Sequence, residues 1–313
     1  MTAAADRARN AFLRACELDV QVRKPGNVSL VSPGHGMDAA LFLASAKAAA
    51  RPLCATGARV GQRIEQAVLA TWAVAGCNTN LGILLLCAPV ALAAERQPQA
   101  TTPAELRAAI TEVLAELNLA DAQAAFRAIA RANPGGLGSA AQQDVHQAPS
   151  VDLRAAMALA AERDSIALQY RDGYAQVFGI GLPALGPAFS AGSPGAPGQP
   201  PGRATVAAVQ RAYLALLSSL PDSHIARRQG RDTADAVLRE AMQWHALVQS
   251  GADLDADPAF AAWDQALKDQ HINPGTSADL TVASLMVATL ASSPETALKT
   301  VPGLFQKGMP IRG

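Results

Sequence analysis

An uncharged stretch between Glu65 and Glu95 constrains the fold more than any other part of the sequence. Two apolar, helix-prone runs, residues 66–75 and 81–94, flank a polar connection at residues 76–80 (Gly-Cys-Asn-Thr-Asn). The run 81–94 has 14 residues, whereas a membrane-spanning helix needs about 20. The stretch therefore predicts two buried helices of a globular protein rather than a membrane hairpin.

The polar connection between these helices is the first indication of a functional site. Asn78, Thr79 and Asn80 bring two amides and a hydroxyl between two apolar helices. Burial of a polar group without a hydrogen-bond partner costs about 1–3 kcal/mol, so such groups are expected to serve a purpose. We expect this turn to reach into a binding site.

Composition favours an all-α fold, a single multi-helix globular domain with buried central helices. Half of the 313 residues are hydrophobic but only 4% are aromatic, and Ala and Leu, which dominate the core, are good helix formers. No long alternation of β-branched residues indicates a large sheet. Length alone fits two domains equally well. We interpret residues 1–313 as one domain and the Pro/Gly-rich segment at about 186–204 as a loop within it.

Helical patterns recur along the rest of the chain. We expect helices over residues 3–17, 37–50, 61–75, 81–94, 102–117, 120–132, 152–174, 205–220, 231–250, 257–268 and 277–292, and an irregular tail from 301. One start signal is explicit: Thr102 is expected to cap its helix, with Pro103 in the first and Glu105 in the third position.

Charge and cysteine content limit the partners. The net charge is zero, which disfavours nucleic acid or an anionic membrane as the main partner but allows a local basic pocket for phosphates. The four cysteines form no CxxC pair or zinc pattern, so reduced and mostly buried thiols are expected.

The first residues lack the apolar core of a signal peptide, which predicts a cytoplasmic protein. The oligomeric state stays open, a homo-oligomer included.

Polar clusters lie at the expected helix ends. Lys24 precedes a Pro-Gly turn and Asn27, where a cation and free backbone N–H groups can hold a phosphate, although a solvated turn explains the same pattern. His35 and Asp38 can face one pocket, or Asp38 can simply cap a helix. Acids and arginines at residues 162–172 fit either a site or a surface ion-pair face.

Two further clusters lie towards the C-terminus. Residues 221–230 form a short segment, expected to be irregular, in which an acid, a histidine and two arginines (Asp222, His224, Arg227 and Arg228) can bind a metal–phosphate unit. Residues 273–280 open a helix, whose free N–H groups suit an anion, and Asp279 can serve either the site or the helix dipole. The sequence contains no P-loop and no GxGxxG.

Together these motifs resemble the triphosphoribosyl-dephospho-CoA synthases of citrate lyase and malonate decarboxylase maturation. The resemblance covers nearly the whole chain in order. It rests on Glu17, residues 24–28 (Lys-Pro-Gly-Asn-Val), His35 with Asp38, residues 76–82 (Gly-Cys-Asn-Thr-Asn-Leu-Gly), 222–227 (Asp-Ser-His-Ile-Ala-Arg) and 274–280 (Pro-Gly-Thr-Ser-Ala-Asp-Leu). It implies an all-helical enzyme that transfers a triphosphoribosyl group from ATP to the ribose 2′-hydroxyl of dephospho-CoA, releases adenine and uses Mg²⁺.

Three departures from the family pattern point to a divergent branch. Asn80 stands where the family usually has His, Ser223 follows Asp222 in place of Thr, and the order is His35-Gly36-Met37-Asp38 rather than His-x-Asp-Met. Proteins of this divergent type are also associated with tetrahydromethanopterin synthesis in one-carbon metabolism. Phosphoribosyl transfer to that cofactor is therefore an alternative. A hydrolase of an N-glycosidic bond and a non-catalytic helical interaction module are two others.

The expected roles follow from the resemblance and from the clusters at helix ends. Ribosyl transfer needs an anion near the developing positive charge, a base for the incoming hydroxyl and cations for phosphates. The expected catalytic residues are His35, Asp38, Glu65 and Asp222. The expected substrate- or phosphate-binding residues are Lys24, Asn27, Asn78, Thr79, Asn80, Arg227 and Ser277. Asp222 and Asp279 are the expected Mg²⁺ ligands, because hard oxygen ligands suit this ion. The expected partners are ATP or another phosphoribosyl donor and a small-molecule acceptor.

Overall fold

The computed structural model describes residues 2–140, 142–187, 189 and 200–291. Within these ranges the chain is helical and contains no strand, only two isolated bridges, which confirms the all-α prediction. The first half comprises α1 (Ala3–Gln21), α2 (Ala39–Leu53), α3 (Val60–Ala75), α4 (Leu81–Arg96), α5 (Pro103–Ala115), α6 (Leu119–Ala132), α7 (Leu153–Ala160) and α8 (Ser165–Asp172). The second half comprises the π-helical turn η1 (Val177–Gly181), α9 (Leu182–Leu185), α11 (Arg203–Leu217), α12 (Ser223–Gln229), α13 (Arg231–Gln249), the 3₁₀ turn η2 (Leu254–Ala256), α14 (Pro258–Asp269) and α15 (Gly275–Ala291).

Local signals account for most helix boundaries, with two corrections. The capping box of Thr102 and Glu105 forms as expected at the start of α5. The single helix predicted over 152–174 is wrong. The chain breaks after α7, and Asp164 caps a new helix, α8, by accepting hydrogen bonds from the N–H groups of Ile166 and Ala167. The segment 221–230 is also not irregular, because residues 223–229 form α12.

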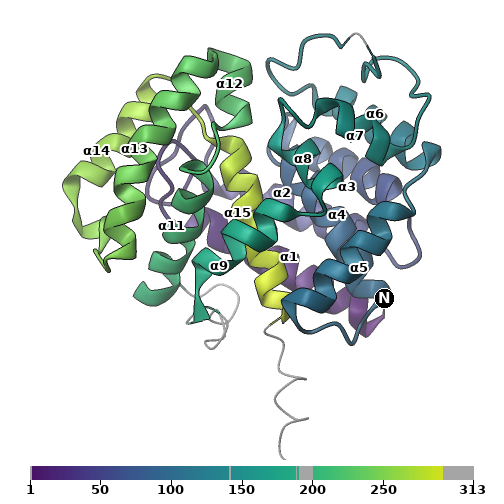
Figure 1. Cartoon of the computed structure of the whole chain (residues 1–313), viewed down its shortest axis with the longest axis horizontal. Helices are drawn as coiled ribbons and strands as arrows, with labels where there is room; N and C mark the ends of the chain where they lie inside the picture. The colour runs from purple at the N-terminus through teal and green to yellow at the C-terminus, as the bar shows by residue number, and fades with distance from the viewer. Residues whose placement is uncertain (1, 141, 188, 190–199, 292–313) are drawn as a thin grey trace, which may run out of the picture.

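Two apolar helices form the centre of the molecule. In α4 every residue from 81 to 94 is buried, as the uncharged stretch predicts. In α15 the hydroxyls of Thr281 and Ser284 donate to carbonyls one turn earlier, so these polar side chains are buried with partners. α15 packs against α1, α4 and α11. Figure 1 shows it running between two groups of helices, with α3–α8 on one side and α11–α14 on the other.

The buried apolar residues form two clusters. The larger cluster includes residues of α1–α6 and most of α15, and the smaller one is built mainly from α11–α14 together with Ala278 of α15. Helix α11 contributes to both, through Val209 to the larger and Leu214 to the smaller. Continuity through α11 and α15 fits the predicted single domain, which stays a prediction. The loop predicted at about 186–204 also stays a prediction, because residues 188 and 190–199 lie outside the described residues. The tail from 301 lies outside them as well.

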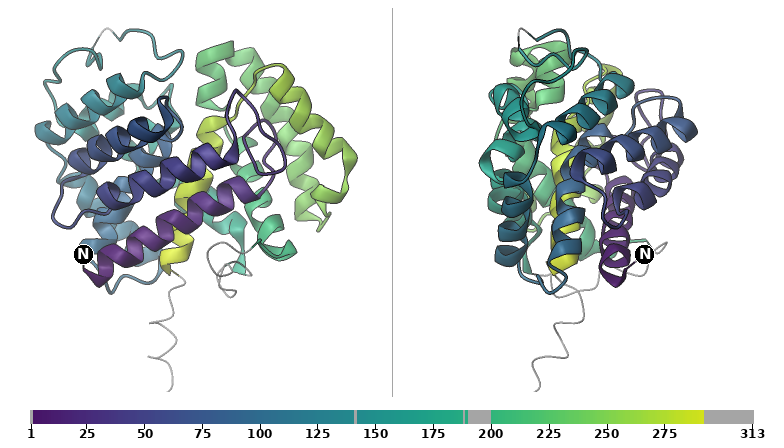
Figure 2. Two further views of the ribbon diagram at one scale, coloured as in Figure 1. Left: turned by 180° about the vertical axis from the view of Figure 1, so that it is seen from behind. Right: turned by 90° about the vertical axis from the view of Figure 1, so that its right-hand side faces the viewer.

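The segment between α1 and α2 extends towards the opposite group of helices. α1 and α2 lie side by side, and Figure 2 shows the loop that joins them reaching the face of α14. Hydrogen bonds confirm this contact: the Gly26 N–H donates to Asp264, and Lys268 donates to Ser32. The predicted polar turn at residues 23–27 is therefore held by a helix more than 200 residues away in the sequence.

The membrane and thiol predictions agree with the structure as far as it extends. None of the helices in the described ranges combines the length and the hydropathy that crossing a bilayer requires. All four cysteines are free; Cys16, Cys54 and Cys87 are buried, and Cys77 is half-buried. Burial raises the pKa of the Cys54 thiol to about 12, so this thiol is unreactive at neutral pH.

A close approach of α3 and α6 gives a test of the fold. A Cβ on Gly61 would lie 2.5 Å from the backbone oxygen of Asp121, and backbone atoms cannot move aside easily. We expect Gly61→Ala to lower the free energy of unfolding by about 1–3 kcal/mol, measured by urea denaturation. Gly202→Ala is the control, because a Cβ there meets nothing within 4 Å. Equal stability of both variants would contradict the close packing of α3 on α6.

Candidate active site

A cleft of about 1760 Å³ opens between the two groups of helices. One wall comes from α12 and the start of α15, and the other from α8 and the loop that follows α6 (Figure 1). The turn before α4 and the loop at 33–37 complete it. Segments from the whole length of the chain therefore meet at this cleft. It is the natural candidate for the functional site, because ligand pockets of proteins are concave and often lie between helices.

The Asn78–Thr79–Asn80 turn lines the cleft, as its sequence suggests. Asn78 Oδ1 accepts a hydrogen bond from the Leu81 N–H, 3.1 Å away, and so fixes the turn. Thr79 and Asn80 are 9% and 5% exposed, and neither the hydroxyl of Thr79 nor the side-chain nitrogen of Asn80 has a hydrogen-bond partner in the described part of the chain. Two buried polar groups thus remain available to a ligand.

Several acidic residues also line the cleft, Asp19, Asp164 and Asp279 among them. Asp279, in the first turn of α15, packs against Gly82 of α4: a Cβ on Gly82 would lie 2.0 Å from Asp279 Oδ2. No residue of the described chain donates a hydrogen bond to the Asp279 carboxylate. Burial raises its pKa well above 3.8, and the charges of Asp19, Asp222 and Asp164 raise the pKa further. A cation in this part of the cleft would be favourable.

Asp222 is a structural link rather than a group that faces the cleft. It is 2% exposed and does not line the cleft. Its Oδ1 accepts from the N–H groups of His224 and Ile225, and its Oδ2 accepts from the N–H and hydroxyl of Ser277 at 2.7 and 2.8 Å. Burial raises its pKa, and these hydrogen bonds oppose the rise. The expected roles of Asp222 in catalysis and Mg²⁺ binding, and of Ser277 in substrate binding, do not fit this arrangement, because four donors occupy the carboxylate.

Lys24 is not a cation exposed at a turn. It is fully buried, and its Nζ donates to the Asp19 carbonyl at 2.7 Å and to Asn27 Oδ1 at 3.0 Å, besides pairing with the Asp19 carboxylate at 3.0 Å. It does not line the cleft. The expectation that Lys24 binds phosphate is corrected accordingly: its charge neutralises Asp19 and holds the turn.

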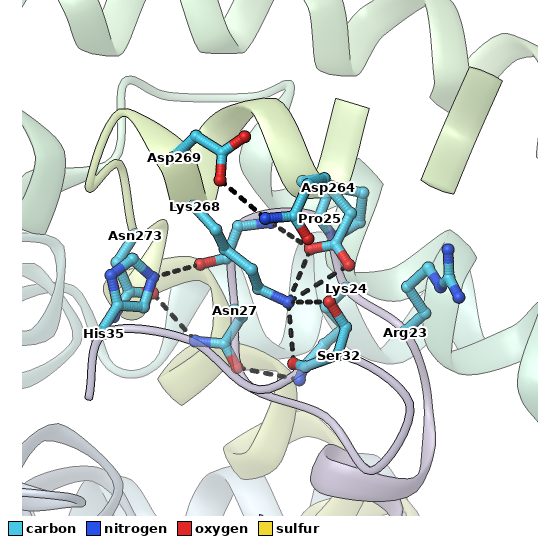
Figure 3. A network of polar contacts seen from close by, with 12 residues as sticks. Arg23, Lys24, Pro25, Asn27, Ser32, His35, Asp264, Lys268, Asp269 and Asn273 are labelled. Carbon is cyan, nitrogen blue, oxygen red and sulfur yellow. Dashed lines mark hydrogen bonds and ion pairs between the residues drawn. The ribbon is translucent and has the colours of Figure 1, made fainter. Parts of the chain in front are cut away.

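A polar network fixes the side chains that this loop presents to the cleft (Figure 3). Lys268 Nζ pairs with Asp264 at 2.9 Å and donates to the Ser32 carbonyl at 2.8 Å. Asn27 donates to Asn273 Oδ1 at 3.0 Å, while His35 Nε2 lies 2.8 Å from the Gly26 carbonyl. Both Asn27 and His35 line the cleft, as expected for site residues.

His35 is held as a neutral imidazole. Burial lowers its pKa, and the charges of Lys268, His271 and Arg228 lower it further, while the hydrogen bond to the Gly26 carbonyl opposes the shift. Because Nε2 donates to that carbonyl, Nδ1 of the neutral ring is the acceptor. A neutral histidine with a free acceptor nitrogen can take a proton from a substrate hydroxyl.

Two expected catalytic acids lie away from the cleft. Asp38 is exposed and caps α2 by accepting from the Leu41 N–H. Glu65 forms a bidentate pair with Arg127 across α3 and α6, at 2.6 and 2.9 Å. Neither lines the cleft. Their predicted catalytic roles are therefore corrected, since a helix cap and a surface ion pair account for both.

Arg227 lies in the cleft as expected. It pairs with Asp164 Oδ2 at 3.2 Å and donates to the Gly135 carbonyl at 3.2 Å, so it joins α12 to α8 and to the loop after α6. Residues of the cleft that the sequence did not single out are Asp19 and the loop at 133–138, whereas Arg228 belongs to the cluster expected at 221–230. Asp19 had one signal, a charge between apolar Leu18 and Val20 just before the Lys24 turn.

The sequence matches one known family along nearly its whole length. Residues 5–296 match the family described as CitG, ATP:dephospho-CoA triphosphoribosyl transferase. This chain belongs to that family. It is an enzyme, a transferase of the triphosphoribosyl-dephospho-CoA synthase type, which confirms the family expected from the motifs.

Comparison with other proteins agrees with this assignment at the level of the fold. No curated protein matches the chain. Among solved structures, a protein of Archaeoglobus fulgidus provisionally named a triphosphoribosyl-dephospho-CoA synthase shares 23% sequence identity and superposes with a TM-score of 0.57. The match covers 80% of this chain and 98% of the archaeal chain. It supports the all-helical fold of this transferase.

The buried pair of Lys24 and Asp19 can be tested by removing its cation. Lys24→Met leaves the Asp19 carboxylate buried without its counter-charge, which we expect to lower the free energy of unfolding by about 3–5 kcal/mol. The double variant Lys24→Met/Asp19→Asn should recover part of this loss, as measured by chemical denaturation. A Lys24→Met protein of native stability would mean that Lys24 is free to serve a ligand.

His224 predicts a specific pH dependence of stability. Burial lowers its pKa from 6.5 to about 4, and the neighbouring charges of Arg227, Arg228 and His35 act in the same direction. Above pH 6.5 the group is neutral in both folded and unfolded chains. Below it the unfolded chain takes up the proton first, so at pH 4.5 this residue should destabilise the fold by about 2–3 kcal/mol.

The measurement compares the native protein with His224→Asn by urea denaturation at pH 7 and pH 4.5. The difference in unfolding free energy between the two proteins should move in favour of the variant at the lower pH. Comparison with the variant removes the contribution of the carboxylates, whose raised pKa values act in the opposite direction. A pH-independent difference would show that His224 titrates normally.

Proposed function

We propose that the cleft transfers the triphosphoribosyl group of ATP to the ribose 2′-hydroxyl of dephospho-CoA. The observation that carries this proposal is the pair of unpartnered buried groups, Thr79 Oγ1 and Asn80 Nδ2, at the wall of the cleft. A hydroxyl and an amide that lack partners suit the hydroxyls of a ribose or the edge of a base. The family assignment supports ATP as donor and dephospho-CoA as acceptor.

The proposed reaction breaks one bond and forms one bond. The bond between C1 of the ATP ribose and the adenine nitrogen breaks, and its electron pair leaves with adenine. The acceptor hydroxyl oxygen forms the new bond to C1, and its proton finally resides on adenine. The phosphoanhydride bonds of ATP stay intact, so the whole triphosphate moves with the ribose.

The residues of the cleft suit the charges that develop. Positive charge on the sugar is stabilised by the carboxylate of Asp279, since Lys24 and Arg227 already pair with Asp19 and Asp164. His35, neutral and with Nδ1 as acceptor, takes the proton of the attacking hydroxyl and passes it on towards adenine. Arg227, whose charge Asp164 already offsets, contributes hydrogen-bond donors to a phosphate nearby.

Mg²⁺ fits this site as a partly protein-held ion. The described residues contain no group of three or more acidic, histidine or cysteine side chains able to hold a metal alone. Mg²⁺ is usually held by one or two carboxylates together with substrate phosphates. Asp279 would hold it, because its carboxylate accepts no hydrogen bond from the described chain, whereas Asp222 is fully bonded. When bound, the ion would offset the charge of the triphosphate.

Thr79 gives the sharpest test of the proposed site. We expect Thr79→Val to reduce the rate of adenine release from ATP, in the presence of dephospho-CoA, by at least about tenfold, because one lost hydrogen bond in the transition state is worth about 1.4 kcal/mol or more. Its stability should stay within about 1 kcal/mol of the native value, since the hydroxyl has no partner to lose. Chromatography of adenine and urea denaturation are the two measurements.

Thr71→Val is the matched control. The Thr71 hydroxyl is also buried without a partner among the residues that the structure describes, but Thr71 lies on α3 and does not line the cleft. This variant should keep the native rate. Equal loss of activity in both variants, or none in either, would remove the support for Thr79 as a substrate-binding group.

The same assay separates the other functions that the sequence allows. Adenine release without an acceptor would indicate a hydrolase. Absence of release with any donor would favour an interaction module. Neither of these alternatives, nor the tetrahydromethanopterin alternative, is supported by the family assignment.

A further inference from the structure

The cations around the cleft differ in whether a carboxylate already neutralises them. Arg227 pairs with Asp164, Lys268 with Asp264, and Arg231 with Asp235. Two other arginines of the cleft have no carboxylate partner within the described ranges. Arg163 still donates to the Leu159 carbonyl, at 3.5 Å, whereas the Arg228 guanidinium has neither an ion pair nor a hydrogen bond to any described residue.

Arg228 extends from one wall of the cleft to the other. It lies on α12 one turn after His224, so the two side chains share a helix face, and both line the cleft. On the opposite wall its guanidinium lies against the backbone of Gly135: a Cβ on that glycine would fall 2.4 Å from Arg228 Nη1. The absence of a side chain at Gly135 leaves the space that the guanidinium fills.

The surroundings of Arg228 carry uncompensated positive charge. The neighbouring Arg227 charge is offset by Asp164, but no acid of the described chain pairs with Arg228. Burial is the largest cause of the lowered pKa of His224, and the charges of Arg227 and Arg228 lower this pKa further. The charge of Arg228 also contributes to the lowered pKa of His35, for which burial is again the largest cause. An anion at Arg228 would relieve this repulsion.

We propose that Arg228 and His224, together with the Gly135 backbone that positions Arg228, form a subsite for a phosphoanhydride chain. Arginine suits this ligand because its planar fork can donate two hydrogen bonds to phosphate oxygens. This subsite would bind the phosphates that the sequence assigned to Lys24, which is buried and cannot reach a ligand. Which substrate supplies this phosphoanhydride rests on the proposed function, in which both the donor and the acceptor carry phosphoanhydrides.

Binding of inorganic tripolyphosphate tests the subsite without any reaction. Calorimetric titration of the full chain at fixed pH and ionic strength should give a dissociation constant at least about tenfold higher for Arg228→Gln than for the native protein. The loss of one charge-assisted contact accounts for about a tenfold change in affinity. Constant ionic strength is needed because salt screens exposed charges. Native-like binding by Arg228→Gln would overturn the proposal.

Two further variants distinguish the subsite from general charge attraction. Arg239→Gln removes the same charge from an exposed position on α13 outside the cleft, and it should bind like the native protein. Gly135→Ala keeps every charge but displaces the Arg228 guanidinium, and it should weaken binding in the same direction as Arg228→Gln. Equal weakening by Arg239→Gln, or no effect of Gly135→Ala, would contradict a built site.

Steady-state kinetics identify the source of the phosphate chain. A rise of the Arg228→Gln KM for ATP alone assigns the subsite to the donor triphosphate, and a rise for dephospho-CoA alone assigns it to the acceptor diphosphate. Unchanged KM values for both in an active variant would overturn the assignment to a substrate. If the native protein releases no adenine at all, the proposed function fails, while the tripolyphosphate titration still decides whether the subsite exists.

Discussion

The buried carboxylate of Asp222 is the contact on which the cleft depends. It caps α12 and also accepts two hydrogen bonds from Ser277 at the start of α15, so one side chain fixes two helix N-termini against each other. Burial of a carboxylate is unfavourable unless donors surround it, and here four do. Since α12 carries His224 and the two arginines and α15 carries Asp279, the geometry of one whole wall follows from this link.

A second buried network holds the loop between α1 and α2. Lys24 of the loop pairs with Asp19 near the end of α1, and Lys268 with Asp264 fastens the loop to α14. Both cations therefore stabilise the fold and hold neighbouring side chains, and neither is free for a ligand. The network keeps His35 at the cleft in a left-handed backbone conformation, with φ of 55°. Polar residues of a sequence motif can thus position a site without touching the substrate.

Charges are unevenly distributed along the cleft, and the Arg227–Asp164 pair joins the two regions. Carboxylates gather where α4, α8 and α15 meet, while Arg227 and Arg228 on α12 face the loop after α6. Such a division suits a substrate that carries negative phosphates at one end and develops positive charge at the other. The all-helical frame allows this because helix ends, where polar side chains and free backbone groups occur, converge on the cleft while the apolar helix bodies form the core.

The sequence by itself determined the helical class, the buried pair of helices around residues 76–80 and the family, because hydrophobic periodicity, capping residues and motif order are local properties of the chain. It also placed Asn27, His35, Asn78–Asn80, Arg227 and Asp279 near a site. Only the tertiary structure decided which polar residues are free. Asp38 and Glu65 lie away from the cleft, Lys24 is buried against Asp19 and Asn27, and donors that include the distant Ser277 surround Asp222. Arg228 has no ion-pair or hydrogen-bond partner among the described residues, because the packing of helices, and not local sequence, decides which charged side chains meet.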